Sequence, residues 1–258
     1  MTGRSADPLS AHNGAAANAV CRLHFGAQTF TLDPSGAAYW HEQRALLVAD
    51  LHLEKGSAFA KRGMFLPPYD SAATLSRLAG AIARYRPAHV VALGDSFHDT
   101  YGAMRLAPEE RDRLSQMQEG LEWTWLTGNH DPHADVNALT DGSRDAAHKR
   151  TLEKAELSGI ELRHEPACHL DNSKLQIAGH FHPVARVAAR RGGARRRCFV
   201  ADNNSLILPA FGAFTGGLNV LSPVFSTIFP QLTSAFVAVL GQNEVYPIPP
   251  SRLAPDFK

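Results

Sequence analysis

Five clusters of polar residues follow strand-like apolar runs, and their side chains are of types that bind metal ions. The segment LTGNHDPH (126–133) presents an amide, two imidazoles and a carboxylate directly after an apolar stretch. Comparable clusters are the D-x-H of 50–52, the G-D of 94–95, His164 and the G-H-F-H of 179–182. Because α/β folds place their sites at the carboxyl ends of strands, we expect these clusters to meet in space.

The donor types predict a site for two divalent cations. Residues i and i+2 of an extended segment point the same way, so Asp50 and His52 are expected to aim at one point. The same spacing pairs His180 with His182. Glycines before several clusters allow sharp turns and close approach of the backbone. Imidazole, carboxylate and amide ligands without thiolate suit Mn²⁺, Fe or Zn²⁺, and their number suits two ions that clamp a phosphate displacement.

Buried strands and connecting helices must position the first three clusters. Continuous apolar runs that end in charge predict central strands at 44–52, 88–99 and 122–131. The helix expected within 66–87 has Asp70 as its N-cap, and the helix expected within 107–121 has Pro108 near its first turn. Residues 142–158 are left open as helix or loop.

The remaining segments are predominantly strand-like. Alternating runs between 21 and 40 predict an antiparallel meander, and the tail at 233–249 predicts a closing hairpin. Several short strands are expected between 160 and 211. The order β-α-β-α-β, followed mostly by β, predicts two packed sheets with helices outside.

Composition narrows the class of protein. The chain has 258 residues, 44% hydrophobic content and a net charge of +1, so global charge predicts no membrane or nucleic-acid partner, although a local patch remains possible. Three cysteines without CxxC spacing fit a reducing cytoplasm. Residues 1–20 lack an apolar signal core and are expected to be a disordered leader before a single domain at 21–258.

The order D-x-H, GD, GNHD, a later His and GHxH resembles the calcineurin-like metallophosphoesterases over about residues 45–185. The resemblance implies an α/β fold, a four-layer α/β/β/α sandwich of two mixed β-sheets flanked by helices. It implies one metal held by Asp50, His52, Asp95 and His182. It implies a second metal held by Asp95, Asn129, His164 and His180, with Asp95 bridging. His130 would face the substrate phosphate and Asp131 would steer it, which makes both residues catalytic candidates.

Further segments are similar to the bacterial DNA ligase-associated metallophosphoesterases over nearly the whole chain after the leader. They are ALGDSFHD, LTGNHDP, RHEP, AGHFHP and LPAFGAFTGGLNV. This resemblance implies a bacterial, cytoplasmic, Mn²⁺-dependent phosphodiesterase or nuclease that accompanies a DNA ligase and a helicase in DNA-damage repair. For the run at 208–219 we favour a glycine-rich turn that packs Phe211 and Phe214 into the core.

Two residues beside the predicted ligands keep alternative interpretations. The superfamily usually has an acid three or four positions after the GD, where this chain has His98 and Asp99. His98 is therefore either a loop histidine or a substrate contact. Asp131 either steers His130 or caps a helix that begins at Pro132.

Six arginines between 186 and 197 allow two interpretations, a solvated hairpin tip or a contact to the phosphate backbone. The candidate substrate contacts in this run are Arg195, Arg196 and Arg197. The function we favour is a DNA endonuclease or phosphodiesterase. The first alternative is a phosphatase or pyrophosphatase acting on nucleotides or small phosphate esters. The second alternative is a non-catalytic scaffold that retains the fold, and the oligomeric state is left open.

Overall fold

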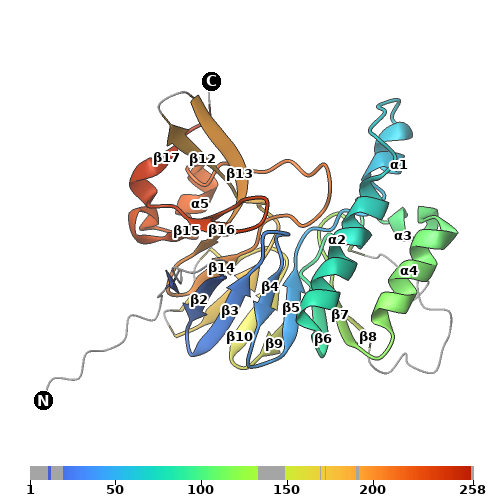
Figure 1. Cartoon of the computed structure of the whole chain (residues 1–258), viewed down its shortest axis with the longest axis horizontal. Coiled ribbons are helices and arrows are strands. Elements are labelled where there is room, and N and C mark those ends of the chain that lie inside the picture. Colours follow the sequence, from blue (N-terminus) through green and yellow to red (C-terminus); the bar gives the residue numbers. More distant parts are fainter. Residues whose placement is uncertain are drawn as a thin grey trace, which may run out of the picture.

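Two β-sheets pack face to face in the computed structural model, with helices on their outer surfaces (Figure 1). The structure describes residues 11–12, 20–132, 149–168, 170–171, 173–189 and 192–256. Most of the expected leader lies outside these residues, as does the helix considered after Pro132. Within the leader, β1 (Ala11–His12) pairs with β2 at the edge of the first sheet.

The first sheet combines the predicted meander with a parallel half. Its antiparallel part is β2 (Cys21–Phe25), β3 (Gln28–Leu32), β4 (Ala38–Trp40) and β5 (Ala45–Val48). The strands that run parallel to β5 are β6 (His89–Ala92), β7 (Glu122–Leu126) and β8 (Lys149–Leu152). Parallel pairing brings the carboxyl ends of β5, β6 and β7 to one edge, as the sequence predicts.

The second sheet collects the strands of the C-terminal half, in the order β16-β15-β13-β14-β11-β10-β9. The first part comprises β9 (Lys154–Leu157), β10 (Ile160–Arg163), β11 (Leu175–Ala178), β12 (Val184–Ala189) and β13 (Gly192–Ala201). The rest comprises β14 (Ser205–Ile207), β15 (Phe236–Leu240), β16 (Val245–Pro247) and β17 (Leu253–Ala254). The predicted closing hairpin is β15–β16. The part of 142–158 that the structure describes, residues 149–158, contains β8 and β9.

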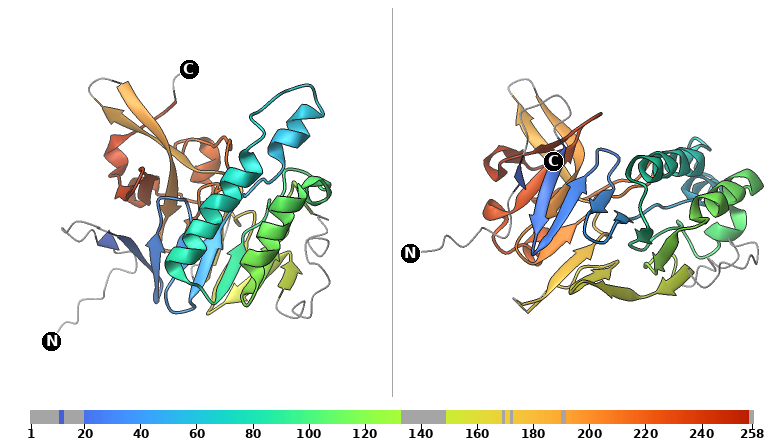
Figure 2. Two further views of the ribbon diagram at one scale, coloured as in Figure 1. Left: turned by 45° about the vertical axis from the view of Figure 1, so that its right-hand side comes forward. Right: turned by 60° about the horizontal axis from the view of Figure 1, so that its bottom comes forward.

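Three apolar layers separate four structural layers, which confirms the α/β/β/α sandwich. Leu47 of β5 and Phe199 of β13 belong to the core between the sheets. The neighbouring Leu46 points to the other face and packs with Leu75 of α2 (Asp70–Tyr85). On the outer face of the second sheet, Phe225 of α5 (Pro223–Ser226) closes a third core. Alternation along β5 therefore serves two cores at once. Two further views of the ribbon show helices on the outer sides of the sheets (Figure 2).

The helices over the first sheet are α2 and α4 (Pro108–Gln118), with short helices α1 (Lys55–Ala60) and α3 (Gly102–Arg105) in the connections (Figure 1). Pro108 occupies the first turn of α4, as predicted. The expected N-cap role of Asp70 is wrong. Tyr69 is the N-cap, and the carboxylate of Asp70 instead accepts the amide of Gly56 at 3.0 Å, which ties α1 to α2. In the described part of the chain, no helix combines the length and apolar character needed to cross a membrane.

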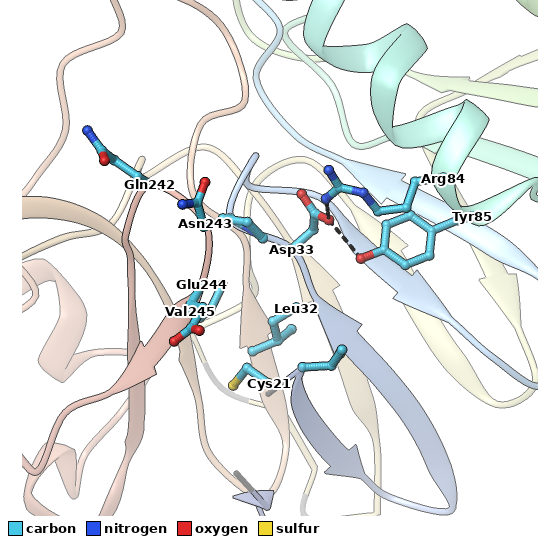
Figure 3. A pocket seen from close by; sticks show the side chains of 11 residues that line it. Cys21, Leu32, Asp33, Arg84, Tyr85, Gln242, Asn243, Glu244 and Val245 are labelled. Atoms are coloured by element: carbon cyan, nitrogen blue, oxygen red, sulfur yellow. Dashed lines mark hydrogen bonds and ion pairs between the residues drawn. The ribbon is translucent and has the colours of Figure 1, made fainter. Parts of the chain in front are cut away.

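A pocket of about 410 Å³ lies between the β3–β4 turn, the end of α2 and the β15–β16 turn, and none of the predicted ligands lines it (Figure 3). Asp33, at 1% exposure, accepts hydrogen bonds there from the Ser35 amide, the Arg84 guanidinium and the Tyr85 hydroxyl at 2.6–2.8 Å. Burial works against ionisation of Asp33, but these hydrogen bonds lower its pKa. The buried carboxylate therefore holds the meander to α2 in its ionised form.

We expect Asp33→Asn to lower the free energy of unfolding at pH 7 by about 1–3 kcal/mol, because partners of a buried acceptor lose their bonds. The folded-state pKa is lowered, so this stabilisation is full above the unfolded pKa of about 3.9 and is lost as pH falls through the folded value. Urea unfolding at pH 7 and pH 3 measures both effects. Asp112→Asn, at an exposed position, is the control. If Asp33→Asn lowered the free energy of unfolding equally at pH 7 and pH 3, the stabilising role of the ionised Asp33 would be contradicted.

Candidate metal centre

Loops from both sheets bring the predicted ligands together. The loops after β5, β6 and β7 carry the clusters of the first sheet, and those after β10 and β11 carry the clusters of the second. Ligand atoms of Asp50, His52 and His182 lie within 4.8 Å of one another, and so do those of Asp50, Asp95 and His164. Residues up to 132 positions apart in the sequence therefore share one site.

The four residues expected at the first metal form one half of the site. Nε2 of His52 lies 3.1 Å from Nε2 of His182. Nε2 of His182 lies 3.4 Å from the carboxylate of Asp50. Oδ2 of Asp95 lies 3.8 Å from Nε2 of His52. The D-x-H loop of the first sheet and the GHxH loop of the second thus contribute to the same half.

The four residues expected at the second metal form the other half, and Nε2 of His164 lies at its centre. This nitrogen is 2.9 Å from Oδ1 of Asn129 and 3.1 Å from Nδ1 of His180. It is 3.4 Å from Oδ2 of Asp95, the same oxygen that faces His52 in the first half. Asp95 therefore lies between the two halves.

The chemistry of these donors fits divalent cations. In each half, two imidazole nitrogens lie 3.1 Å apart, and a carboxylate oxygen lies 3.4 Å from one of them. Convergent nitrogen and oxygen donors without sulfur suit Mn²⁺, Fe or Zn²⁺. Cys21 and Cys198 are buried in the apolar cores, where burial raises their pKa values, so neither is a candidate ligand. The residues present therefore fit the implied metals.

Protonation differs sharply within the cluster. Burial works against a charged His164, but the carboxylates of Asp95 and Asp50 raise its pKa to about 9. Burial is also the main influence on His52 and lowers its pKa to about 3. For Asp95, burial is outweighed by His164 and other hydrogen-bonding partners, which lower its pKa to about 2. Because a ligating imidazole must be neutral, a cation would displace the proton of His164.

The ligand loops are not extended, which corrects the structural reason given for the i, i+2 pairs. Asp50, His52, His180 and His182 have φ values of 54°, 43°, 71° and 46°. Asp95 shares this left-handed backbone, with φ of 47°. For residues with a Cβ this region is unfavourable, and such strain is concentrated at functional sites. The paired side chains thus converge through successive left-handed turns.

Two glycines let the ligand loops touch. A Cβ on Gly128 would lie 2.0 Å from Oδ1 of Asp95. A Cβ on Gly179 would lie 2.6 Å from Oδ2 of Asp50. The prediction that glycines before the clusters permit close approach is confirmed at both positions.

His130 lies at the open side of the site, with 41% of its side chain exposed. Its Nδ1 lies 3.0 Å from the carbonyl of His98, which accepts a hydrogen bond when that nitrogen is protonated. This contact directs Nε2 toward the cluster, 4.0 Å from Oδ2 of Asp95. The backbone amide of His130 also donates to Oδ1 of Asp95 at 2.9 Å. Backbone and ring are therefore both held relative to the Asp95 carboxylate.

Asp131 makes different contacts from those expected. Its carboxylate accepts the amides of Phe97 at 3.0 Å and Gly128 at 2.9 Å, and burial raises its pKa. It therefore joins the loops after β6 and β7 instead of holding the ring of His130. The His98 carbonyl, which the sequence analysis did not identify, performs that task, as the Leu93 carbonyl does for Nδ1 of His164 at 3.0 Å. Every residue has a backbone carbonyl, so the residue types in the sequence do not indicate which carbonyls orient the histidines.

His98 lies beside the site, and its ring stacks on that of His130 with centroids 5.1 Å apart. Its Nδ1 is buried without a hydrogen-bond partner. Burial first, and then the charge of Lys55, lower the pKa of His98 to about 4. His98 therefore places a neutral imidazole ring against His130.

The arginine run separates into different environments. Arg197 donates to the carbonyl of Ala210 at 2.7 Å, and Arg195 donates to the carbonyl of Gly217 at 2.6 Å and to Asp256. Arg196 lies between them and is exposed. Two of the three candidate substrate contacts, Arg195 and Arg197, thus bind other groups of the protein.

Comparison with known proteins gives a structural likeness over nearly the whole chain. No protein-family model and no curated protein matches this sequence. The crystal structure of a Pseudomonas putida nuclease, MPE, is similar with a TM-score of 0.63 and 26% sequence identity, over 93% of this chain and 100% of that chain. This likeness supports the assignment of the fold.

Two further solved structures match more weakly. The phosphoesterase Yfce from E. coli has a TM-score of 0.36 and 16% identity, over 81% of this chain and 94% of that one. A protein of unknown function from Aquifex aeolicus has a TM-score of 0.35 and 15% identity, over 58% of this chain and 82% of that one. These values are too low to support a functional argument.

We expect Asp95→Asn to lower the affinity for Mn²⁺ by more than about 100-fold. Loss of an outer-shell partner already costs about 10–100-fold, and Asp95 contacts both halves. His130→Ala is the matched variant, because its ring lies outside the two sets of predicted ligands and should leave the affinity near that of the wild type. Titration of each purified protein with Mn²⁺ measures this. Wild-type affinity in Asp95→Asn would reject the bridging role, and a large loss in His130→Ala would make His130 a ligand.

Proposed function

We propose that this protein is a phosphodiesterase with two divalent metal ions, acting on DNA as a nuclease. The observation that carries the proposal is the convergence of two carboxylates, an amide and four imidazoles on two adjoining points that share Asp95. The structural likeness to a nuclease supports the same reaction class. Mn²⁺ is the metal we propose, with Fe or Zn²⁺ as the alternatives that the donor set also suits.

The residues of the chain then take distinct roles. Asp50, His52 and His182 would hold one ion, and Asn129, His164 and His180 the other, with Asp95 between them. Bound divalent cations supply an activated water and neutralise charge on phosphate oxygens. The loops keep these groups preorganised, which is where most of the electrostatic benefit of such sites arises.

His130 is the residue that we assign to the substrate. Its Nδ1 faces the His98 carbonyl, so Nε2 is the nitrogen that remains toward the open side of the cluster. In the protonated form, Nε2–H can donate to a phosphate oxygen and transfer its proton to the leaving oxygen as the P–O bond breaks. Asp131 supports this geometry through the loops, by binding the amides of Phe97 and Gly128.

The biological setting is part of the proposal. The motif series that resembles ligase-associated metallophosphoesterases supports a bacterial, cytoplasmic role in DNA repair beside a DNA ligase and a helicase. The exposed Arg196 is the member of the arginine run that we propose as a contact to the phosphate backbone. His98, with its ring against His130, is the second proposed substrate contact.

A comparison of three substrates tests the function. With Mn²⁺ present, we expect faster hydrolysis of bis-p-nitrophenyl phosphate than of p-nitrophenyl phosphate, together with cleavage of single-stranded DNA. His130→Ala should lower the turnover number on the diester by about 10²–10⁴-fold, because a positioned proton donor is lost. Faster hydrolysis of the monoester without cleavage of DNA would instead support the phosphatase alternative. No turnover on any substrate by Mn²⁺-loaded protein would support the scaffold.

A further inference from the structure

The glycine-rich segment at 208–219, which we call the brace, contacts both ligand-bearing loops. At one end, the amide of Phe211 donates to the carbonyl of Ala49 at 2.8 Å, and the amide of Gly212 donates to that of Asp50 at 3.1 Å. At the other end, the amide of Leu218 donates to the carbonyl of Phe181 at 3.4 Å. The brace therefore joins the D-x-H loop of the first sheet to the GHxH loop of the second.

Packing at these two contacts is as close as backbones allow. A Cβ at Gly212 would lie 2.2 Å from the carbonyl oxygen of Leu51, and a Cβ at Gly217 would lie 2.2 Å from that of His182. The expectation that both aromatic residues of this segment are core residues is only half right. Phe211 is buried, whereas Phe214, between the two contacts in sequence, is 49% exposed. The position of the brace thus bears directly on the spacing of the two ligand loops.

Guanidinium groups hold the end of the brace nearest the D-x-H loop. Nη1 of Arg197, from β13, lies 2.7, 3.4 and 3.3 Å from the carbonyl oxygens of Ala210, Phe211 and Gly212. Arg77, from α2, donates to the same carbonyl of Phe211 and lies over its ring, with the guanidinium carbon 5.5 Å from the centroid. Arg197 therefore faces three consecutive carbonyls of the brace, and Arg77 shares the middle one, that of Phe211.

This pair of cations has no acidic partner in the part of the chain that the structure describes. Burial, and then the charge of Arg77, lower the pKa of Arg197 to about 10. The two guanidinium groups repel each other because they carry like charges at one carbonyl. The hydrogen bonds to the carbonyls of the brace must offset this repulsion. The sequence gives no sign of this, because Arg197 stands among five other arginines of the hairpin.

We propose that Arg197 and Arg77 are positioning residues of the metal centre. They fix the brace, and the brace fixes the separation between the Asp50–His52 loop and the loop of His180 and His182. The inference rests on the proposed metal site, because it concerns how that site is held. It assigns no contact with metal or substrate to either arginine.

The effect on metal affinity separates positioning from simple electrostatics. Removal of a nearby positive charge, by itself, strengthens binding of a cation. If the arginines position the ligand loops, removal of the Arg197 or Arg77 side chain weakens binding of the cation instead. Loss of an outer-shell orienting group lowers metal affinity by about 10–100-fold, which is the size of effect that we expect.

The experiment is a Mn²⁺ titration of metal-free protein, followed by the electron paramagnetic resonance signal of free Mn²⁺. We expect Arg197→Ala to raise the dissociation constant about 10–100-fold. Arg196→Ala removes the same charge from the preceding residue of β13, whose exposed side chain has no hydrogen bond or ion pair among the described residues, and should keep the wild-type constant. Arg197→Lys retains the charge but lacks the planar fork, so an intermediate constant is expected.

The outcomes distinguish the two proposals. If wild-type protein binds no Mn²⁺, the proposed manganese site fails. If wild-type protein binds Mn²⁺ and Arg197→Ala binds equally or more tightly, or if Arg196→Ala is weakened as much, only the positioning role fails. Circular dichroism of the metal-free variants tests for folding. If Arg197→Ala does not fold, Arg197→Lys and Arg77→Ala decide, and wild-type constants in both would overturn the inference.

Discussion

The carboxylate of Asp95 is the contact on which the rest of the metal centre depends. One of its oxygens faces an imidazole from each half of the site, at 3.8 Å from His52 and 3.4 Å from His164, and the other accepts the amide of His130. A buried carboxylate is costly unless it is paired and hydrogen-bonded, so these partners have to be in place together. The loops that carry Asn129, His130 and His164 all bring groups to this carboxylate.

Two sheets supply those groups, and this division explains much of the local structure. Five of the predicted ligands have left-handed backbone, and glycine stands where a Cβ would collide with Asp50 or Asp95. Asp131 uses its carboxylate on backbone amides of two loops of the first sheet, and the brace at 208–219 connects the first sheet to the second. Packing between the sheets alone would set their separation less closely, since apolar contacts are non-directional. Directed hydrogen bonds at the loops provide the remaining constraint.

The meander, the parallel strands and the identity of the clustered residues could be predicted from the sequence, because each leaves a local pattern of period or spacing. The contacts of Asp131, Asp70 and Arg197 could not. A carboxylate has the same sequence pattern whether it meets solvent or accepts a backbone amide 14 or 34 residues away. A guanidinium likewise has the same pattern whether it meets substrate or donates to a backbone carbonyl 14 residues away. The spacing of the D-x-H motif could not predict the backbone conformation of its loop either. Extended segments and segments with alternating left-handed residues can both direct residues i and i+2 to one point.

The most direct test of this account is anomalous diffraction at the manganese absorption edge from crystals grown with Mn²⁺. The account predicts two peaks about 3.5–4 Å apart on either side of the Asp95 carboxylate, one beside His52 and His182 and the other beside Asn129, His164 and His180. A single peak, or peaks that do not share Asp95, would contradict it.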